Sequence, residues 1–241
     1  MKVAALLTGR GNNTLKDKNV LPVLGHPLLH YPAMAARRCE LITDFYCSSD
    51  DEKILDAAAD CGYKKIMRPP ELALPTAQHV DAIVHALKVM KKDGCEPDIL
   101  VVLLANSAIV KTEWVRDSIQ QILNDPEVSA ACPVERDQDH HPFRAKTLGP
   151  DGRLVPFFDF TGKKVSTNRQ DLSPCFYFCH NFWTLNLKKT LYSSEPGQQP
   201  WTFMGNNIRP IEVHDCFDVH DLEDIRRTEK WLKEGGLVDE F

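Results

Sequence analysis

The sequence has no long apolar run and no excess of positive charge. No window reaches the roughly 18 consecutive apolar residues of a membrane span, and the first apolar run ends at Thr8 and Gly9, too early for a secretory signal. Lysine and arginine number 29 against 34 aspartates and glutamates, which gives a net charge of −5. This balance disfavours nucleic acid and membrane surfaces as partners, but it leaves room for a local phosphate pocket.

Disulfide and zinc patterns are also missing. The 8 cysteines are scattered along the chain. Without an export signal, we expect free thiols in a reducing compartment and therefore a cytoplasmic protein. Cys175, Cys179 and His180 lie close together in sequence, but no second pair of ligands follows at zinc spacing. Small buried thiols are the favoured interpretation.

What the sequence does contain is an alternation of short apolar runs and amphipathic segments. With 43% hydrophobic residues, a chain of this length buries enough surface to fold without a metal or disulfide. The alternation predicts an α/β fold with a mainly parallel sheet flanked by helices. Predicted strands cover 3–7, 44–48, 99–104, 128–133 and 208–215, and predicted helices begin near 27, 51, 76, 114 and 221.

Residues 135–178 break this alternation. The segment contains the turn pairs Asp151-Gly152 and Thr161-Gly162 and the extended runs RLVPFFDF and CFYF. Turns and runs of this kind favour antiparallel strands. We interpret the chain as a single domain, residues 1–241, with an inserted antiparallel arm that could cross to a partner subunit.

The segment TGRGNNT, residues 8–14, directly follows the first predicted strand. Ligands of parallel sheets bind beyond the carboxyl ends of the strands, and a turn rich in glycine and asparagine lets backbone N–H groups approach a phosphate. Arg10, Lys16 and Lys18 add positive charge there. The segment is neither a Walker loop nor a GxGxxG motif, so taken alone it also fits a plain turn.

A second candidate is the segment FDVHDLED, residues 217–224. It places three aspartates and a histidine between a predicted strand and the last predicted helix. Asp218 and its neighbours could hold a hard divalent cation there. The alternative is that Asp221 caps the helix and the other acidic side chains are solvated. The spacing alone leaves both interpretations open.

Five further blocks follow one another along the chain: LLTGRGNNTLKDKNVLPVLGHPLL, RPPELALPTAQHVDAIVHAL, LLANS, VSAACPVE with HHPF, and CFDVHDLEDIRRTE. The opening block carries Lys18-Asn19 and then Gly-x-Pro-Leu. In this order the blocks resemble the CMP-sialic acid synthetase (acylneuraminate cytidylyltransferase) family. The block at 68–87 resembles the Arg-Pro-x-Glu-Leu-Ala stretch of that family and its following Thr-Ala.

The resemblance implies a Rossmann-like nucleotidyltransferase fold and a homodimer whose arms reach each other's active sites. It also implies a reaction in which CTP is joined to the anomeric hydroxyl of a 3-deoxy-2-ulosonic, sialic-acid-like sugar acid, with Mg²⁺ as cofactor and pyrophosphate as the second product. Chemistry of this type depends on positioning the reactants and neutralising phosphate charge.

Position by position, the resemblance makes Arg10, Lys18 and Asp218 the catalytic residues, with Asp218 and also His220 as candidate metal ligands. Gln78 and His79, expected to face residues 8–14, are candidates for contacting nucleotide or sugar, although a plain role at a helix start is equally compatible. The implied nucleotide-binding residues are Leu7, Thr8, Gly9, Gly11, Asn12, Asn13, Asn19, Arg68, Thr76 and Ala77, and the substrate-binding candidates are Gln78, His79, Asn106, Ser107, Lys111 and Arg169.

The sequence departs from the family pattern at three places, which indicates a divergent member. Arg10 lies one place later than the family arginine, Ala105-Asn106 replaces Gln-Pro-Thr, and His220 stands at the second aspartate of Asp-x-Asp. Because Mg²⁺ prefers oxygen ligands, three arrangements are open. Asp221 or Asp224 compensates, His220 acts as a base, or Asp218 holds the metal with the triphosphate alone, which we favour.

These departures keep two other functions open. One is a nucleotidyltransferase with another acceptor, such as an eight-carbon ulosonic acid or a phosphonate. The other is a non-catalytic nucleotide-binding homologue. Retention of Lys18, Arg68 and Asp218 favours the enzyme, because binding alone has less need of the full phosphate-binding set.

Overall fold

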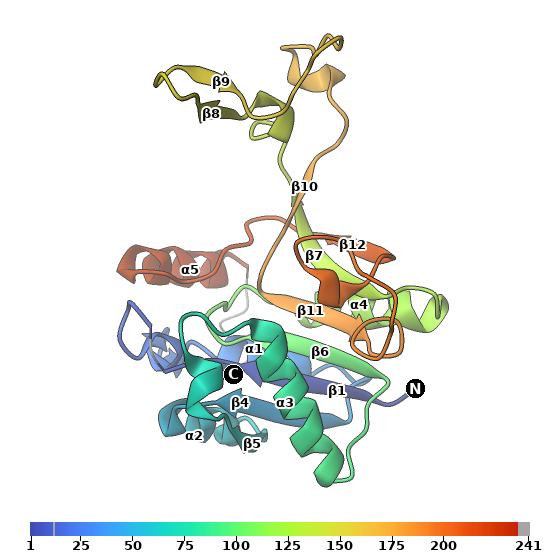
Figure 1. Ribbon diagram of the computed structural model, residues 1–241. Coiled ribbons are helices and arrows are strands. Elements are labelled where there is room, and N and C mark those ends of the chain that lie inside the picture. The colour runs from blue at the N-terminus through green and yellow to red at the C-terminus, as the bar shows by residue number, and fades with distance from the viewer. Residues whose placement is uncertain (12, 236–241) are drawn as a thin grey trace.

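The computed structural model describes residues 1–11 and 13–235 (Figure 1). Within these residues, the centre of the molecule is an eight-stranded sheet in the order β10-β7-β11-β6-β1-β4-β5, with β12 paired to β7. The strands are β1 (Val3–Thr8), β4 (Asp44–Ser49), β5 (Lys64–Met67), β6 (Ile99–Leu104), β7 (Ala130–Arg136), β10 (Phe176–Phe178), β11 (Phe182–Asn186) and β12 (Ile208–Glu212).

The sheet is mixed, with parallel pairing through its centre. Strand β1 pairs in parallel with β4 and β6, β4 with β5, and β12 with β7. Strand β11 runs antiparallel to both β6 and β7, and β10 is antiparallel to β7. The predicted α/β class with a mainly parallel sheet is confirmed, and the structure adds β11 as an antiparallel strand inside it.

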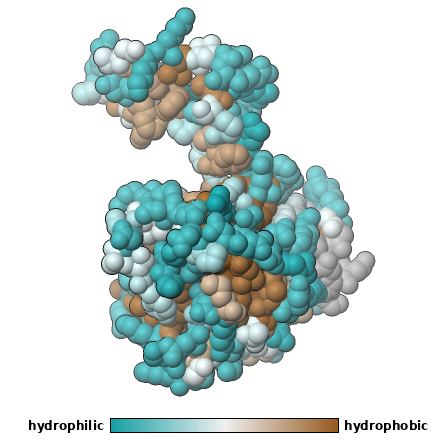
Figure 2. Space-filling view, turned by 90° about the vertical axis from the view of Figure 1, so that its right-hand side faces the viewer, coloured by the Kyte–Doolittle hydropathy of each residue, from teal (hydrophilic) through white to brown (hydrophobic). Residues whose placement is uncertain are grey.

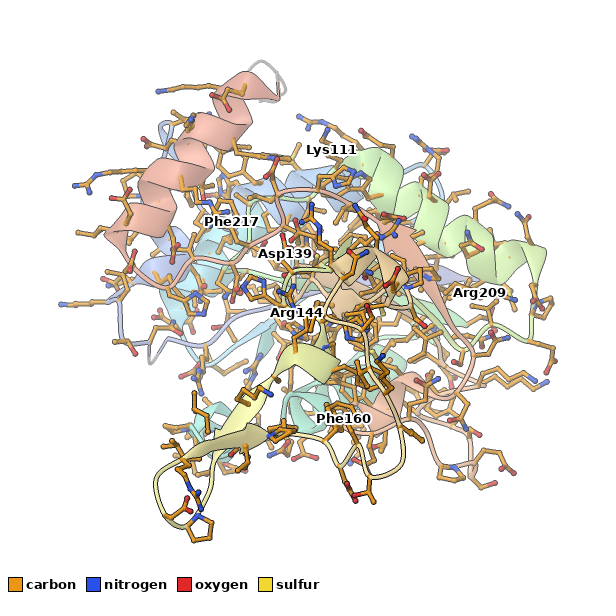
Figure 3. The ribbon with its side chains drawn as sticks, turned by 90° about the horizontal axis from the view of Figure 1, so that it is seen from above. Lys111, Asp139, Arg144, Phe160, Arg209 and Phe217 are labelled. Carbon is orange, nitrogen blue, oxygen red and sulfur yellow. The ribbon has the colours of Figure 1, made fainter. Side chains whose placement is uncertain are left out.

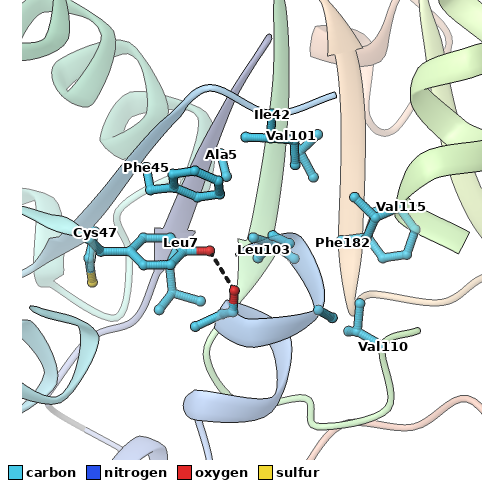
Figure 4. Packing of buried hydrophobic residues seen from close by; sticks show 14 of the residues in the cluster. Ala5, Leu7, Ile42, Phe45, Cys47, Val101, Leu103, Val110, Val115 and Phe182 are labelled. Carbon is cyan, nitrogen blue, oxygen red and sulfur yellow. Dashed lines mark hydrogen bonds between the residues drawn. The ribbon is translucent and has the colours of Figure 1, made fainter. Parts of the chain in front are cut away.

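Helices cover both faces of this sheet, and the apolar strands divide their side chains between the two layers. The β6 residues Val101 and Leu103 belong to the cluster under α1 (His30–Arg37), α2 (Glu52–Asp60) and α4 (Thr112–Asn124), whereas Leu100 and Val102 pack under α3 (His79–Lys92). Figure 4 shows side chains from β1, β6 and β11 packed together in the first layer. Burial on both faces explains why β6 is apolar throughout.

Helix α3 begins three residues later than its sequence pattern suggests. The predicted start at Thr76 falls in a turn, where the Ala77 N–H donates to the Leu74 carbonyl, and Gln78 is the N-cap. A 3-10 turn at Pro70–Ala73 precedes this region. The chain is therefore still reversing direction at Thr76, and the helix starts only at His79.

Residues 137–175 leave the body between β7 and β10 and form an arm that projects away from it (Figure 1). The arm carries an antiparallel pair, β8 (Lys146–Leu148) and β9 (Leu154–Pro156). Figure 2 shows apolar surface on this arm. The exposed side chains include Phe143, Leu148, Leu154, Val155, Phe157 and Phe158.

The carboxyl ends of β1, β4 and β6 lie side by side, because Thr8 is in register with Ser48 and with Leu104. The chain that follows each strand therefore meets at one edge of the sheet. A short hairpin of β2 (Pro22–Val23) and β3 (His26–Pro27) flanks this edge, and helix α5 (Leu222–Glu234) packs over it. In the described part of the chain, no helix combines the length and apolar character needed to cross a membrane.

Candidate active site

A cavity of about 510 Å³ opens at this edge of the sheet. Its walls come from the segment after β1, the start of α3, the end of β6 and the segment before α5. The lining residues are Thr8, Gly9, Arg10, Asn13, Thr14, Lys18, Asn19, Arg68, Leu72, Leu74, Ala77, Gln78, His79, Ala82, Leu104, Asn106 and His220.

The backbone of residues 9–13 is anchored to the protein. The Gly9 N–H donates to the Ser48 carbonyl at 3.3 Å, and the Gly11 N–H donates to Asp50 Oδ1 at 3.0 Å. The Asn13 N–H donates to the Gly11 carbonyl. A phosphate cradle built from backbone N–H groups therefore requires Gly11 to exchange the Asp50 carboxylate for a phosphate oxygen.

Gly11 is required by close packing and not by its backbone angles. A Cβ atom at this position would lie 2.8 Å from both Cβ and Oδ2 of Asp51, the N-cap residue of α2. Contacts this short do not occur between real side chains, so any other residue would push the segment away from α2. The start of α2 thus fixes the position of the segment that follows β1.

Three cations line the cavity: Arg68 is buried, Lys18 is half-buried and Arg10 is partly exposed. Arg68 is only 6% exposed; its guanidinium donates to the Ser48 carbonyl at 2.9 Å and to Ser48 Oγ at 3.3 Å. Within the described residues it forms no ion pair with a carboxylate. Burial lowers the pKa of Lys18 below its ordinary value, and the charge of Asp218 only partly offsets this. Together with Arg10, these residues form a partly desolvated positive surface that favours an anionic ligand.

His79 lies at the inner end of the cavity. Its Nε2 is 2.9 Å from Thr8 Oγ1, and its ring is 5.1 Å from that of Trp183. Burial, together with the charges of Arg68 and His180, lowers the pKa of His79 to about 4. The imidazole is therefore neutral at physiological pH.

The segment before α5 is joined to the chain that follows β6. Asn106 Nδ2 donates to Asp218 Oδ2 at 2.8 Å, and the Val219 N–H donates to the Asn106 carbonyl. Ser107 Oγ donates to the Phe217 carbonyl at 3.2 Å. Asp218 does not line the cavity itself, but Asn106 holds its carboxylate against the wall.

The two other aspartates of this segment have a structural role. Asp221 accepts hydrogen bonds from the N–H groups of Glu223 and Asp224, and Asp224 accepts from the Asp221 N–H, which completes a capping box. The interpretation of Asp221 as a helix cap is therefore confirmed. Asp224 Oδ2 also accepts from the His220 N–H, so one oxygen of each of these two carboxylates is engaged in capping α5.

A magnesium ion fits this site only in a restricted way. No group of three or more histidine, cysteine or acidic residues able to hold a metal occurs in the described residues. The Nε2 atom of His220 lies 3.5 Å from Asp218 Oδ2, and its side chain is 70% exposed. One carboxylate combined with substrate phosphates and water is nevertheless a usual way for proteins to bind Mg²⁺.

Several residues from the sequence analysis lie away from the cavity. Leu7 and Ser107 are fully buried, and neither they nor Gly11 and Thr76 are among the residues that line the cavity. Lys111 lies at the start of α4 (Figure 3), with its Nζ atom 5.5 Å from the centroid of the Trp114 ring and 5.6 Å from that of the Trp231 ring. Arg169 lies in the arm, 2.8 Å from Asp139. Asn12 falls outside the described residues.

The sequence analysis did not single out the apolar wall of the cavity. Leu72, Leu74, Ala82 and Leu104 contribute to it, and Thr14 adds a polar group. Leu72 and Leu74 lie inside the block that follows Arg68. The resemblance of this block to the family was therefore the one feature of the sequence that could have identified them as cavity residues. Its leucines resembled ordinary core residues, because only the fold shows that they face a cavity.

Comparison with known proteins relates this geometry to a family. The family model described as "Cytidylyltransferase" matches residues 9–149. The N-acylneuraminate cytidylyltransferase of Escherichia coli O18:K1:H7 is 33% identical over 89 residues, 36% of this chain but only 21% of that protein. The 8-amino-3,8-dideoxy-manno-octulosonate cytidylyltransferase of Shewanella oneidensis is 24% identical over 257 aligned positions, 96% of this chain and 99% of that protein.

A solved structure shares the fold across the whole chain. It is the CMP:2-keto-3-deoxy-manno-octonic acid synthetase complexed with CTP, with a TM-score of 0.70 and 17% sequence identity. The match covers 98% of this chain and 100% of that chain. The expectation of a Rossmann-like nucleotidyltransferase fold is confirmed by this likeness.

Proposed function

We propose that this chain, which belongs to the cytidylyltransferase family, joins the CMP part of CTP to the anomeric hydroxyl of a 3-deoxy-2-ulosonic sugar acid. In the reaction, the anomeric hydroxyl loses its proton to water and its oxygen bonds to the α-phosphorus. The bond from that phosphorus to the oxygen that bridges to the β-phosphate breaks, and pyrophosphate leaves. The observation that carries this proposal is the meeting of Arg10, Lys18 and Arg68 on one cavity at the carboxyl ends of β1, β4 and β6.

The residues of the cavity divide the work between charge neutralisation and positioning. Lys18 and Arg10 neutralise charge on the triphosphate and on the departing pyrophosphate, and a half-buried ammonium does this more strongly than one in water. Arg68, held by two hydrogen bonds to Ser48, contacts the nucleotide from a fixed position. Desolvated and fixed donors of this kind lower the barrier because they need no rearrangement during the reaction.

Asp218 is the residue that would hold Mg²⁺. The ion, when bound, neutralises negative charge on the phosphate oxygens. Asn106 orients the Asp218 carboxylate through the 2.8 Å hydrogen bond. Because Asp221 and Asp224 cap α5, the arrangement that we favour leaves Asp218 as the one protein carboxylate on the metal.

The acceptor is a nine-carbon, sialic-acid-like ulosonic acid in our first proposal and an eight-carbon ulosonic acid in the alternative. The relative from Escherichia coli carries a name of the first kind, whereas the Shewanella relative and the structural neighbour carry names of the second kind. The sequence departs from the sialate pattern at Ala105 and Asn106, of which Asn106 lines the cavity and Ala105 is buried. This departure is as compatible with the eight-carbon alternative as with the first proposal.

The test is pyrophosphate release with Mg²⁺ and CTP across a panel of eight- and nine-carbon ulosonic acids, with UTP, ATP and GTP as nucleotide controls. CTP-dependent release with one acid would support the proposal and identify the acceptor. Lys18→Gln should reduce this release by at least about a hundredfold. CTP binding without release for any acid would overturn the proposal in favour of a nucleotide-binding protein or another acceptor class.

A further inference from the structure

The ring of His79 is fixed by a hydrogen bond between the start of α3 and the end of β1. Thr8 Oγ1 lies 2.9 Å from His79 Nε2 and 3.1 Å from the Leu103 carbonyl oxygen. The two residues are 71 positions apart in sequence. This bond therefore exists only because β1 and α3 meet at the cavity.

These two distances determine which ring nitrogen carries the proton. A threonine hydroxyl has a single hydrogen, and Thr8 donates it to the Leu103 carbonyl, which can only accept. The Thr8 oxygen must therefore accept a hydrogen bond from His79 Nε2–H. Since the imidazole is neutral, Nδ1 carries a lone pair and no proton.

Among the described residues, the His79 ring makes its hydrogen bond through Nε2, to Thr8, and His79 lines the cavity. Its Nδ1 lone pair is therefore available to a ligand. Its neighbour in the cavity wall is Arg68, whose guanidinium can only donate. The ring thus places an acceptor beside a guanidinium that can only donate. A phosphate oxygen would be repelled by this lone pair, whereas an N–H or O–H group would be attracted to it.

We propose that His79 is a specificity-determining residue whose Nδ1 accepts a hydrogen bond from a donor group of the nucleoside. The nucleoside of CTP offers two kinds of donor, the 4-amino group of cytosine and the ribose hydroxyls. Both kinds of donor belong to the nucleoside and not to the triphosphate, so either could lie against the His79 ring. The inference rests on the proposed function, because it takes CTP as the nucleotide.

The experiment measures CTP binding by calorimetry, without sugar acid, against three analogues that each lack one donor. These are the triphosphate of 2-pyrimidinone riboside, which lacks the 4-amino group, 2′-deoxyCTP and 3′-deoxyCTP. For the wild-type protein we expect one analogue to bind about tenfold more weakly than CTP, the loss typical of one buried hydrogen bond. That analogue identifies the donor.

Two variants separate the nitrogens of the ring. His79→Gln places an amide N–H where Nε2–H donates to Thr8 but offers no acceptor at the Nδ1 position, so the tenfold discrimination should disappear. His79→Asn keeps an acceptor near the Nδ1 position and loses the donor to Thr8, so the discrimination should remain. Unchanged ratios for all three analogues in His79→Gln would overturn the inference while leaving the proposed function intact.

A second measurement needs no substitution. Long-range ¹H–¹⁵N NMR of the histidine rings should show His79 as the Nε2–H tautomer and should show the Nδ1 resonance moving on addition of CTP. A protonated Nδ1, or no change at Nδ1 with CTP bound, would overturn the inference. Failure of the wild-type protein to bind CTP at all would instead overturn the proposed function.

Discussion

Gly11 packs closely against the start of α2. A single methyl group added at Gly11 would displace the segment that carries Arg10. Asp50 accepts its N–H at 3.0 Å, and an added Cβ would lie 2.8 Å from the Asp51 side chain. Two adjacent carboxylates thus fix the segment that presents Arg10. Both carboxylates accept hydrogen bonds from backbone N–H groups, Asp50 from Gly11 and Asp51 from Lys53.

We expect Gly11→Ala to weaken CTP binding by at least about tenfold, because the segment must shift away from Asp51 and carry Arg10 with it. Calorimetric titration with CTP measures this change. The control is Gly149→Ala in the arm, where an added Cβ meets only ordinary contacts of 3.4 Å or more. Wild-type affinity in Gly11→Ala would show that the position of the segment is not required for binding.

His79 also links stability to pH. Its pKa is about 4 in the folded protein and 6.5 in the unfolded chain, so the unfolded state binds more protons between these values. The free energy of unfolding must therefore decrease as the pH falls from about 6.5 to 4, by up to roughly 3 kcal/mol from this residue alone. His30, His85 and His180, whose pKa values are also lowered by burial, act in the same direction.

Denaturant unfolding at pH 7 and pH 4 measures the His79 contribution when the wild type is compared with His79→Gln. We expect the loss of unfolding free energy between the two pH values to be smaller in the variant by roughly 2–3 kcal/mol. An equal loss in both proteins would mean that His79 is not buried as a neutral ring.

At the scale of the elements, the acidic segment before α5 serves both the helix and the cavity, through different aspartates. Asp221 and Asp224 form the capping box of the helix, whereas Asp218 is joined to Asn106 at the cavity wall. Substitutions in this segment should therefore divide into those that change stability and those that change catalysis.

Asp221→Ala should lower the free energy of unfolding by about 1 kcal/mol, because it removes a helix cap, and should leave most of the pyrophosphate release. Asp218→Asn should instead lower the activity and leave the free energy of unfolding unchanged. It keeps an oxygen to accept from Asn106 Nδ2 and loses the negative charge, so release should fall by about a hundredfold or more at unchanged stability. Denaturant unfolding and the release assay on both variants make the comparison, and equal effects on activity would contradict the division.

At the scale of the whole molecule, the arm exposes several large apolar side chains close together, a feature typical of a protein–protein contact surface. Leu148 and Leu154 face each other across β8 and β9 and are 69% and 70% exposed, and Phe157 is 61% exposed. We propose that these side chains are covered in a homodimer, as the resemblance to the synthetase family implies.

Sedimentation velocity tests the dimer. We expect a dimer for the wild type and a monomer for the double variant Leu148→Glu with Leu154→Glu, because buried unpaired carboxylates at an interface cost several kcal/mol. The control is Tyr192→Glu on the body, where the side chain is 65% exposed. A monomeric wild-type protein would contradict the proposal.

The sequence by itself determined the elements whose formation depends on neighbouring residues. Strands β1 and β6 follow from unbroken apolar runs, and α2 and α5 begin directly after their N-cap residues Asp51 and Asp221, as these capping side chains predict. The resemblance to a known family likewise predicted that Arg10, Lys18 and Arg68 share one site. That resemblance depends only on the order of the blocks along the sequence.

Only the tertiary structure decided which of these side chains meet. It placed β11 antiparallel between β6 and β7, kept Lys111 and Arg169 away from the cavity, and paired Asn106 with Asp218, which lies 112 residues further along the chain. The physical reason is that such contacts depend on strand register and on the packing of helices against both faces of the sheet. No local pattern of residues records either of these.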